Sequence, residues 1–389
     1  MAIKLASLVS VVLSLGSLAL ADPIPATDYD VIVVGGGPSG LSALSGVSRV
    51  RRTALLFDDQ RYRNGPTRNM HDVIGNDGTP PGEFRALARE QILEYPTASI
   101  VNRSVLSITP IGTDKVSAFS VMDADGQNHT ARKVVLGTGL RDVLPDTPGL
   151  REAWGKGIFW CPWCDGYEHR DQGIGILGHL ADVVGSVLEI NTQYSDIVAL
   201  VNGTQTAAGE AETEKRRPEW KKQLEVWNVK LDNRTISSIE RLQDGGMVQD
   251  KADHRQFDNF RINFTTGDSV ERNALLTNFP TVQQSSLPGQ LHLNMTKDKI
   301  AVSSSSMMTS LDGLYAVGDA NSDGSSNVPH AMFSGKKAAV YLHVQLSRED
   351  TASKISKRTG LSPSELEEEA HRAIGRNLEP QWDAVMSRR

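Results

Sequence analysis

Cysteine is scarce in this chain of 389 residues: there are only two, Cys161 and Cys164, and both lie in the stretch WCPWCDGYEH. So few cysteines exclude a disulfide-rich scaffold, and a loop closed over a single C-x-x-C is too short to stabilise a large fold. A tetrahedral zinc site needs four ligands, and no further cysteine exists to complete one, so we predict no metal site. The pair is therefore predicted to be redox-active.

An excess of positive charge is also absent, since the net charge is −6 and both signs are scattered along the sequence. The sequence thus offers no basic face for nucleic acid and no polybasic patch for a membrane, and we expect neither as a partner. The length points to two domains of ordinary size, because a chain this long exceeds one compact core.

The hydrophobic run near the N-terminus is short: Lys4 precedes an apolar stretch from Leu5 to Leu20 that serine and glycine dilute. A membrane span needs about 20 strongly apolar residues, which this stretch does not reach. Ala19 and Ala21 form an A-x-A site, so residues 1–21 are predicted to be a cleaved signal peptide.

Sequons of the type N-x-[ST] add to the signal peptide and favour a glycoprotein of a eukaryotic secretory pathway. Secretion and retention in the lumen of the ER, a vesicle or a vacuole all stay open. The sequons begin at Asn102, Asn128, Asn202, Asn233, Asn263 and Asn294.

A glycine motif follows the first apolar run of the mature chain: DVIVV leads into Gly35-x-Gly37-x-x-Gly40, and a helical pattern comes next. The next apolar run ends at Asp58. Glycines in this position let the backbone approach a pyrophosphate at a helix N-terminus, and an acid at the end of the second strand can accept a ribose hydroxyl. The pattern predicts a dinucleotide-binding unit.

A second unit of the same kind, strand, glycine and helix, spans residues 172–190. Such an internal repeat is typical of a two-domain flavoprotein. Residues 204–258 are rich in charge and are predicted to form a solvated helix and loops. Further on, DGLYAVGDA is a short β-run that ends in Gly318-Asp319, and helical periodicity follows it.

With these motifs in this order, the sequence resembles the low-molecular-weight thioredoxin reductase family from about Asp28 to His343. Within that family it is similar to the fungal flavoenzymes that oxidise dithiols of secondary metabolites, as in gliotoxin-type clusters. The motifs are the Gly35 motif, GTG at 137–139, CPWCDG at 161–166 and GLYAVGDA at 313–320.

The resemblance implies an α/β, pyridine nucleotide-disulfide oxidoreductase-like fold and a homodimer. It places a Rossmann-type FAD-binding domain in two pieces, 22–148 and 286–345, around an inserted, degenerate NAD(P)H-like domain, 149–285, which carries the C-x-x-C. A helical tail, 346–389, would follow.

The resemblance also implies roles for individual residues. Cys164 would be the thiol next to the flavin, Cys161 the one that exchanges with substrate, and Asp165 the acid that moves protons at the pair. The residues expected to hold FAD are Gly35, Gly37, Gly40, Asp58, Thr138, Asp319 and Val328.

The second glycine motif departs from the family, because it reads Gly178-x-Leu180-x-x-Val183. Leu180 is expected to push a side chain into the space that a pyrophosphate needs, and Val183 replaces a small packing residue. No arginine or lysine occurs from Asp196 to Glu212 to pair with a 2′-phosphate. The sequence therefore predicts that the nicotinamide site has decayed.

Without NADPH, electrons must enter through the cysteines. We therefore predict a dithiol oxidase in which O2 reoxidises FAD and H2O2 is formed. The base that makes the substrate thiolate is predicted to be His330, with His169 second. The alternatives are an NADPH-dependent disulfide reductase and a non-catalytic flavin-binding module. The substrate, a small-molecule dithiol or a cysteine pair in a protein, stays open.

Overall fold

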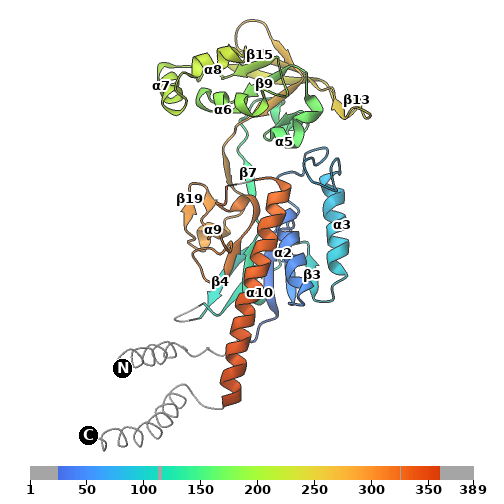
Figure 1. Cartoon of the computed structure of the whole chain (residues 1–389), viewed down its shortest axis with the longest axis vertical. Helices are drawn as coiled ribbons and strands as arrows, with labels where there is room; N and C mark the ends of the chain where they lie inside the picture. The colour runs from blue at the N-terminus through green and yellow to red at the C-terminus, as the bar shows by residue number, and fades with distance from the viewer. Residues whose placement is uncertain (1–24, 113–115, 325, 360–389) are drawn as a thin grey trace, which may run out of the picture.

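The computed structural model describes residues 25–112, 116–324 and 326–359. The predicted signal peptide and residues 360–389 of the predicted tail lie outside these described residues. Figure 1 shows two units stacked along the long axis, each built of strands and helices, as the predicted fold class requires. We call them the lower domain, residues 25–142 and 281–359, and the inserted domain, residues 143–280.

The lower domain contains a seven-stranded sheet in the order β3-β2-β1-β6-β5-β4, with β21 paired to the end of β6. Strands β1, β2, β3, β6 and β21 are parallel, and apolar runs such as VIVV in β1 are buried, as in sheets covered on both faces. The bounds are β1 Tyr29–Val34, β2 Ala54–Phe57, β3 Ala98–Val101, β4 Val105–Ile111, β5 Ala118–Asp123, β6 Asn128–Leu136 and β21 Leu314–Ala316.

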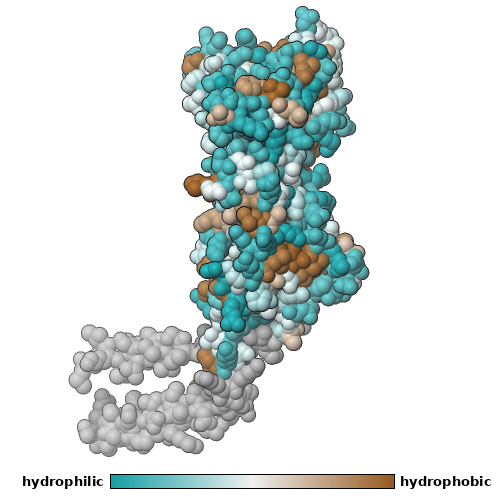
Figure 2. All heavy atoms as spheres, turned by 90° about the vertical axis from the view of Figure 1, so that its right-hand side faces the viewer, coloured by the Kyte–Doolittle hydropathy of each residue, from teal (hydrophilic) through white to brown (hydrophobic). Residues whose placement is uncertain are grey.

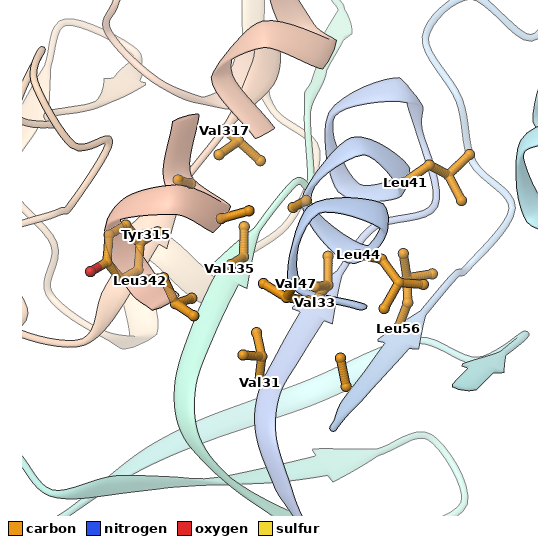
Figure 3. Close-up of a cluster of buried hydrophobic side chains, with 14 of the residues drawn as sticks. Val31, Val33, Leu41, Leu44, Val47, Leu56, Val135, Tyr315, Val317 and Leu342 are labelled. Carbon is orange, nitrogen blue, oxygen red and sulfur yellow. The ribbon is translucent and has the colours of Figure 1, made fainter. Parts of the chain in front are cut away.

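Helices α2 (Pro38–Arg49) and α10 (Val328–Thr359) lie side by side on this sheet (Figures 1 and 3). Leu44 of α2 and Leu342 of α10 share one buried apolar cluster with Val33 of β1 (Figure 3). The two helices pack closely, because a Cβ on Gly46 would lie 2.6 Å from the Cβ of Ala339. This packing brings the N-terminal ends of both helices to the edge of the sheet where the parallel strands end.

The inserted domain has a five-stranded parallel sheet in the order β11-β10-β9-β17-β8, and helix α6 (Leu180–Ile190) packs on it. An antiparallel sheet, β12-β15-β16, packs against its other side. The bounds are β8 Ile158–Phe159, β9 Ile174–Leu177, β10 Ile197–Leu200, β11 Lys230–Asp232, β12 Ile236–Gln243, β15 Asn259–Phe264, β16 Val270–Arg272 and β17 Ala274–Thr277.

The charged segment 204–258 is more ordered than the sequence predicted. The expected single helix is two, α7 (Ala207–Arg216) and α8 (Trp220–Val226), which Pro218 separates. Four strands stand where loops were expected: β11, β12, the short β13 (Gln249–Asp250) and β14 (Arg255–Gln256), which pairs with β13.

Two strands, β7 (Leu140–Asp142) and β18 (Thr281–Gln283), pair antiparallel where the chain passes between the domains. Helix α10 is continuous past residue 345, so the predicted start of the tail falls inside a helix. The remaining elements are α3 Pro81–Leu93, α4 Leu150–Ala153, α5 Pro162–Asp165, α9 Leu287–Gln290, the 3-10 turns η1 Tyr167–His169 and η2 Gly318–Ala320, and the hairpin β19 Met295–Thr296 with β20 Lys299–Ile300.

Among the described residues, no helix combines the length and the apolar composition that crossing a membrane requires. The face drawn in Figure 2 is mostly hydrophilic, and its apolar residues lie in separate patches.

Candidate redox site between the two domains

A cleft opens where β1 and β6 end, at the edge of a parallel sheet where α/β folds bind their ligands. It encloses about 1380 Å³, counting its open mouth. Both domains contribute to it: the lining includes the predicted residues Gly35, Gly37, Thr138, Asp319 and Val328, together with Trp160, Cys164 and Asp165 of the inserted domain.

The glycine loop between β1 and α2 is shaped for a phosphate group. A Cβ on Gly40 would lie 1.9 Å from the carbonyl oxygen of Gly35, so strand and helix meet at a distance that only glycine allows. A Cβ on Gly37 would meet nothing within 4 Å, which leaves backbone open to the cleft. In this described segment, α2 has neither a side-chain cap nor an acid in its first turn, so its N-terminal end can attract an anion.

Two buried polar atoms at the cleft have no hydrogen-bond partner among the described residues, Oγ1 of Thr138 and Oε1 of Gln284. Buried polar groups are normally paired, so polar groups of a ligand are expected to meet these atoms. Together with the open end of α2, they fit a dinucleotide such as FAD.

Asp58 directly follows β2, as predicted, but its side chain is engaged within the chain. Its carboxylate packs beneath the glycine loop, where a Cβ on Gly36 would lie 2.1 Å from it, and it does not line the cleft. It accepts hydrogen bonds from the Tyr62 hydroxyl at 2.6 Å and from Arg89 at 2.8 Å. Burial, helped by the bond to Asp58, raises the pKa of Tyr62 to about 12. The acidic side chain that faces the cleft here is Asp59.

The two cysteines form a disulfide at the start of the short helix α5. Figure 1 places α5 on the side of the inserted domain that faces the lower domain. Cys164 lines the cleft, whereas Cys161 precedes the helix and lies outside the lining. Trp163, between them, is 61% exposed, so the outer side of the pair is apolar and open to a substrate. This placement is compatible with the predicted roles, in which Cys164 lies next to the flavin and Cys161 exchanges with substrate, and both roles stay predictions.

Asp165, the residue after Cys164, also lines the cleft. Burial, and next the negative charge of Glu168, raise the pKa of its carboxyl group to about 8. A carboxyl group with this pKa can both take up and release a proton near neutral pH, as a general acid and base must.

Neither predicted histidine lies in the cleft. His330 sits on α10, where its neighbours Val328 and Ala331 line the cleft, but its own ring turns away and its Nε2 lies 2.8 Å from Oδ2 of Asp323. The reason is helical geometry: successive residues point about 100° apart, so position 330 is off the face that 328 and 331 share.

His169 is buried, and acceptors occupy both of its ring nitrogens. Nε2 lies 2.9 Å from Oδ2 of Asp258, and Nδ1 lies 3.0 Å from the carbonyl oxygen of Asp165. Because both ring nitrogens already face acceptors within the chain and the ring does not line the cleft, His169 is not placed to take a proton from a substrate. The histidine that does line the cleft is His71, in the irregular segment before α3, which has no periodicity or motif that would have singled it out.

A buried ion-pair network ties the two domains together. Arg68 of the lower domain donates to both carboxylate oxygens of Asp258 in the inserted domain, each at 2.9 Å. Arg241 at 2.7 Å and His169 also donate to Asp258, which is fully buried. Although burial opposes ionisation, the bonds from His169 and Arg68 lower the pKa of Asp258 to about 2. A buried charge with several partners holds its neighbours in one arrangement.

A second arginine lies where the chain crosses between the domains. Arg63 donates to Asp142 of β7 at 2.7 and 2.9 Å and to Asp319 at 2.9 Å. Its guanidinium also lies 5.1 Å from the ring centre of Trp160, the residue before Cys161. The predicted FAD residue Asp319 is therefore engaged with Arg63 at the cleft.

The second glycine motif has lost its open helix end, for a reason that the sequence did not predict. Leu180 and Val183 are buried in the apolar core of the inserted domain, so neither side chain fills the space for a pyrophosphate. Instead, the first amides of α6 have acceptors within the chain. The amide of Leu180 donates to Oγ1 of Thr204 at 3.0 Å, and that of Ala181 donates to Nδ1 of His179 at 3.2 Å.

Two arginines nevertheless lie near α6. Arg216 and Arg217, at the end of α7, line a cavity beside Asp182 and Gly185. Arg216 pairs with Asp182 at 2.8 Å, so its charge is offset. The chain after residue 212 thus returns basic residues to this surface, which the prediction from residues 196–212 did not consider.

Comparisons with known proteins agree with this geometry. A family model described as pyridine nucleotide-disulphide oxidoreductase matches residues 29–335. A probable thioredoxin reductase of Arthroderma benhamiae is 52% identical over 363 residues, which covers 91% of this chain and 90% of that protein. Thioredoxin reductase tcpT of Claviceps purpurea is 33% identical over 324 residues, which covers 82% of this chain and 94% of that one.

Solved structures give the same answer. The crystal structure of HlmI matches with a TM-score of 0.74 and 28% identity, covering 86% of this chain and 98% of that one. A putative thioredoxin reductase TrxB of Bacillus anthracis matches with a TM-score of 0.71 and 25% identity, covering 83% of this chain and 99% of that one. The predicted fold class and FAD as cofactor are confirmed. The chain belongs to the pyridine nucleotide-disulphide oxidoreductase family, as a thioredoxin reductase-like FAD oxidoreductase that acts on disulfide and thiol groups.

Proposed function

We propose that the protein oxidises substrate dithiols to disulfides through the Cys161–Cys164 pair, with O2 as the final electron acceptor and H2O2 as product. One observation carries the proposal: the amides at the start of α6 that would bind a nicotinamide pyrophosphate already donate to Thr204 and His179. The matching end of α2 in the lower domain has no such side-chain cap. The start of α2 is thus open to a phosphate, whereas the first amides of α6 already have acceptors within the chain, and this favours electron entry through the cysteines.

The chemistry balances for one dithiol. A substrate thiolate attacks Sγ of Cys161, the bond to Cys164 breaks, and Cys164 leaves as a thiolate. The second substrate thiol gives up its proton and attacks the substrate sulfur of the mixed disulfide, which releases Cys161 and the product disulfide. FAD in the cleft supplies the two-electron acceptor that returns the pair to a disulfide. Overall, one dithiol and one O2 give one disulfide and one H2O2.

The ion pairs between the domains also support electron flow from the cysteines to the FAD site. Arg68 and Asp258 join the lower and the inserted domain in the arrangement that keeps Cys164 in the cleft. Separating the domains would strip partners from a fully buried carboxylate, which is costly. Electrons that enter through the cysteines need only this arrangement of the domains, because it keeps Cys164 in the cleft where FAD would bind.

The deciding experiment compares two electron donors on the purified holoenzyme. Under anaerobic conditions, dithiothreitol should bleach the FAD absorbance within seconds, while NADPH at micromolar concentration should not. In air, dithiothreitol should drive O2 uptake with H2O2 formed in equal amount. Rapid bleaching by NADPH without O2 uptake from dithiols would overturn the proposal.

A specific observation supports the second candidate, an NADPH-dependent disulfide reductase. Arg216 and Arg217 line a cavity beside α6, where a phosphate could be met. Two of the relatives above are also named thioredoxin reductases. The NADPH arm of the same experiment tests this candidate directly.

We further propose a homodimer in the secretory pathway, from the family resemblance and the sequence of the N-terminus. Of the sequons, Asn102, Asn128, Asn202 and Asn294 are exposed and could carry glycans. Asn233 suits a glycan poorly, because its amide nitrogen and oxygen both bond to Gln205. Light scattering and a mobility shift on glycosidase treatment test these points.

A further inference from the structure

A second, smaller cavity lies between the domains, behind the cleft. It encloses about 230 Å³, counting its openings, against about 1380 Å³ for the cleft. His71 and Asp165 line both this cavity and the main cleft, so the two spaces meet at these side chains. Glu168 also lines the smaller cavity but does not reach the cleft.

Glu168 is buried, with 6% of its surface exposed, and its carboxylate is only partly paired. Its Oε1 lies 3.5 Å from Nδ1 of His71, while its Oε2 is buried and has no hydrogen-bond partner among the described residues. Its charge also contributes to the raised pKa of Asp165, so the two carboxyl groups sense each other. A buried carboxylate with one unpaired oxygen is costly unless a proton or a water molecule is shared there.

His71 lies between Glu168 and an exposed carboxylate, that of Asp77. Its Nδ1 lies 3.4 Å from Oδ2 of Asp77 as well as 3.5 Å from Glu168. The side chain of Asp77 is 64% exposed, whereas that of His71 is only 12% exposed. Both distances are long for direct hydrogen bonds, and such contacts commonly tighten when a substrate is bound.

We propose that Glu168 and His71 form a proton relay that connects Asp165, at the cysteine pair, with Asp77 at the surface. Each time a cysteine or substrate thiol becomes a thiolate, its proton moves to Asp165 and then through Glu168 and His71 to Asp77 and solvent. When a thiolate leaves and is protonated, the proton returns along the same path. The relay serves thiol–disulfide exchange in either direction and so does not depend on the choice between oxidase and reductase.

The other charged groups around the cavity are already engaged. Arg68 and His169 both donate to Asp258. The Tyr194 hydroxyl donates to the carbonyl oxygen of Gly166 at 2.6 Å, and burial, with Glu168 and Asp165 nearby, raises the pKa of Tyr194 well above its usual range. These hydrogen bonds already engage the three side chains, so we do not place them in the relay.

The test uses the full-length holoenzyme with His71→Ala, Glu168→Gln and, as a matched control, Glu94→Gln, whose side chain is exposed at the end of α3. Stopped-flow mixing with dithiothreitol follows FAD absorbance in the first turnover, and O2 uptake follows the steady state. Because Asp165 remains, the first turnover should keep its rate in both relay variants. Later turnovers should slow by about tenfold or more, since the proton on Asp165 has lost its exit.

Imidazole at millimolar concentration should restore the steady-state rate of His71→Ala, because it can enter the space opened beside the cleft, but not that of Glu168→Gln, whose site lies deeper. FAD content and melting temperature check folding, and the isosteric Glu168→Gln keeps the test available if His71→Ala is unstable. An equal loss in first and later turnovers, a loss in His71→Ala that imidazole does not restore, or unchanged rates in both variants would each overturn the relay.

If the wild-type enzyme does not turn over dithiothreitol, the oxidase proposal fails rather than the relay. The relay is then tested on enzyme reduced anaerobically with dithionite, by its exchange with an aromatic disulfide that releases a coloured thiolate. Imidazole should then accelerate His71→Ala alone; acceleration of no variant would overturn the relay.

Discussion

Replacing Asp165 with asparagine should stabilise the protein relative to the wild type, and this difference in the free energy of unfolding should grow as the pH rises. The same substitution removes a group that the chemistry needs. Burial raises the pKa of Asp165 from 3.8 to about 8. Between these two values the folded protein keeps a proton that the unfolded chain has already lost. The folded state therefore binds more protons, and the wild-type free energy of unfolding falls as the pH rises through this window.

The size of the effect follows from one proton. Linkage gives at most about 1.4 kcal/mol per pH unit, so the contribution of Asp165 between pH 5 and pH 7 is about 2.7 kcal/mol. Asparagine does not titrate. The free energy of unfolding of Asp165→Asn, minus that of the wild type, should therefore increase by up to about 2.7 kcal/mol from pH 5 to pH 7, and it should level off above about pH 8.

The assay is urea unfolding of both proteins at pH 5, 6, 7 and 8 with saturating FAD, followed by tryptophan fluorescence. Taking the difference at each pH cancels the titrating groups that do not interact with Asp165. Asp146→Asn is the matched control for the removal of one carboxylate, because Asp146 is exposed in the segment before α4. A pH profile for Asp165→Asn no steeper than that of the control would contradict the role of Asp165 as acid and base.

Three further predictions concern the cofactor, the domain contact and the cysteines. Gly36→Ala should purify without FAD, because its Cβ would lie 2.1 Å from the Asp58 carboxylate, and normal FAD content would contradict the account of the glycine loop. Arg68→Met should lower the free energy of unfolding by about 1–3 kcal/mol, since it removes one partner of the buried Asp258 while Arg241 and His169 remain, and an unchanged urea midpoint would argue against the network. Cys161→Ser should abolish dithiol turnover but keep FAD, whereas Cys164→Ser, given substrate as a disulfide, should hold it on Cys161 as a mixed disulfide seen by mass spectrometry. Wild-type O2 uptake in both serine variants would make the cysteines structural.

The parts that the sequence predicted well are contiguous in the chain. The glycine loop and the C-x-x-C each carry their chemistry within a few neighbouring residues, and the structure brings both to one cleft. His71 and Arg68 carry no such pattern, because their importance comes from Glu168 and Asp258, which are far away in the sequence. Burial and pairing of this kind are decided by tertiary packing, which composition and spacing do not contain.

One strand that borders the charged segment had a detectable pattern. β15 begins directly after residue 258 and pairs with β12 inside the segment, and in β15 the buried side chains of Phe260, Ile262 and Phe264 alternate with less buried residues. Period-two alternation predicts a strand with one buried face. High local charge led to the prediction of solvated loops. A strand can nevertheless carry charge on its outer face while its other face packs on the core.

The two glycine motifs show why residue identity at a motif is an incomplete test of function. The motif predicted that Leu180, which replaces a glycine, blocks the helix end. In the structure its side chain is buried in the core and does not cover the helix end. What separates α6 from α2 is competition for the first amides: Thr204 and His179 accept from them in α6, whereas no side chain caps α2. A phosphate must displace an existing acceptor at one site and none at the other. The difference between the two helix ends thus depends on a loop threonine and a capping histidine as much as on the missing glycine.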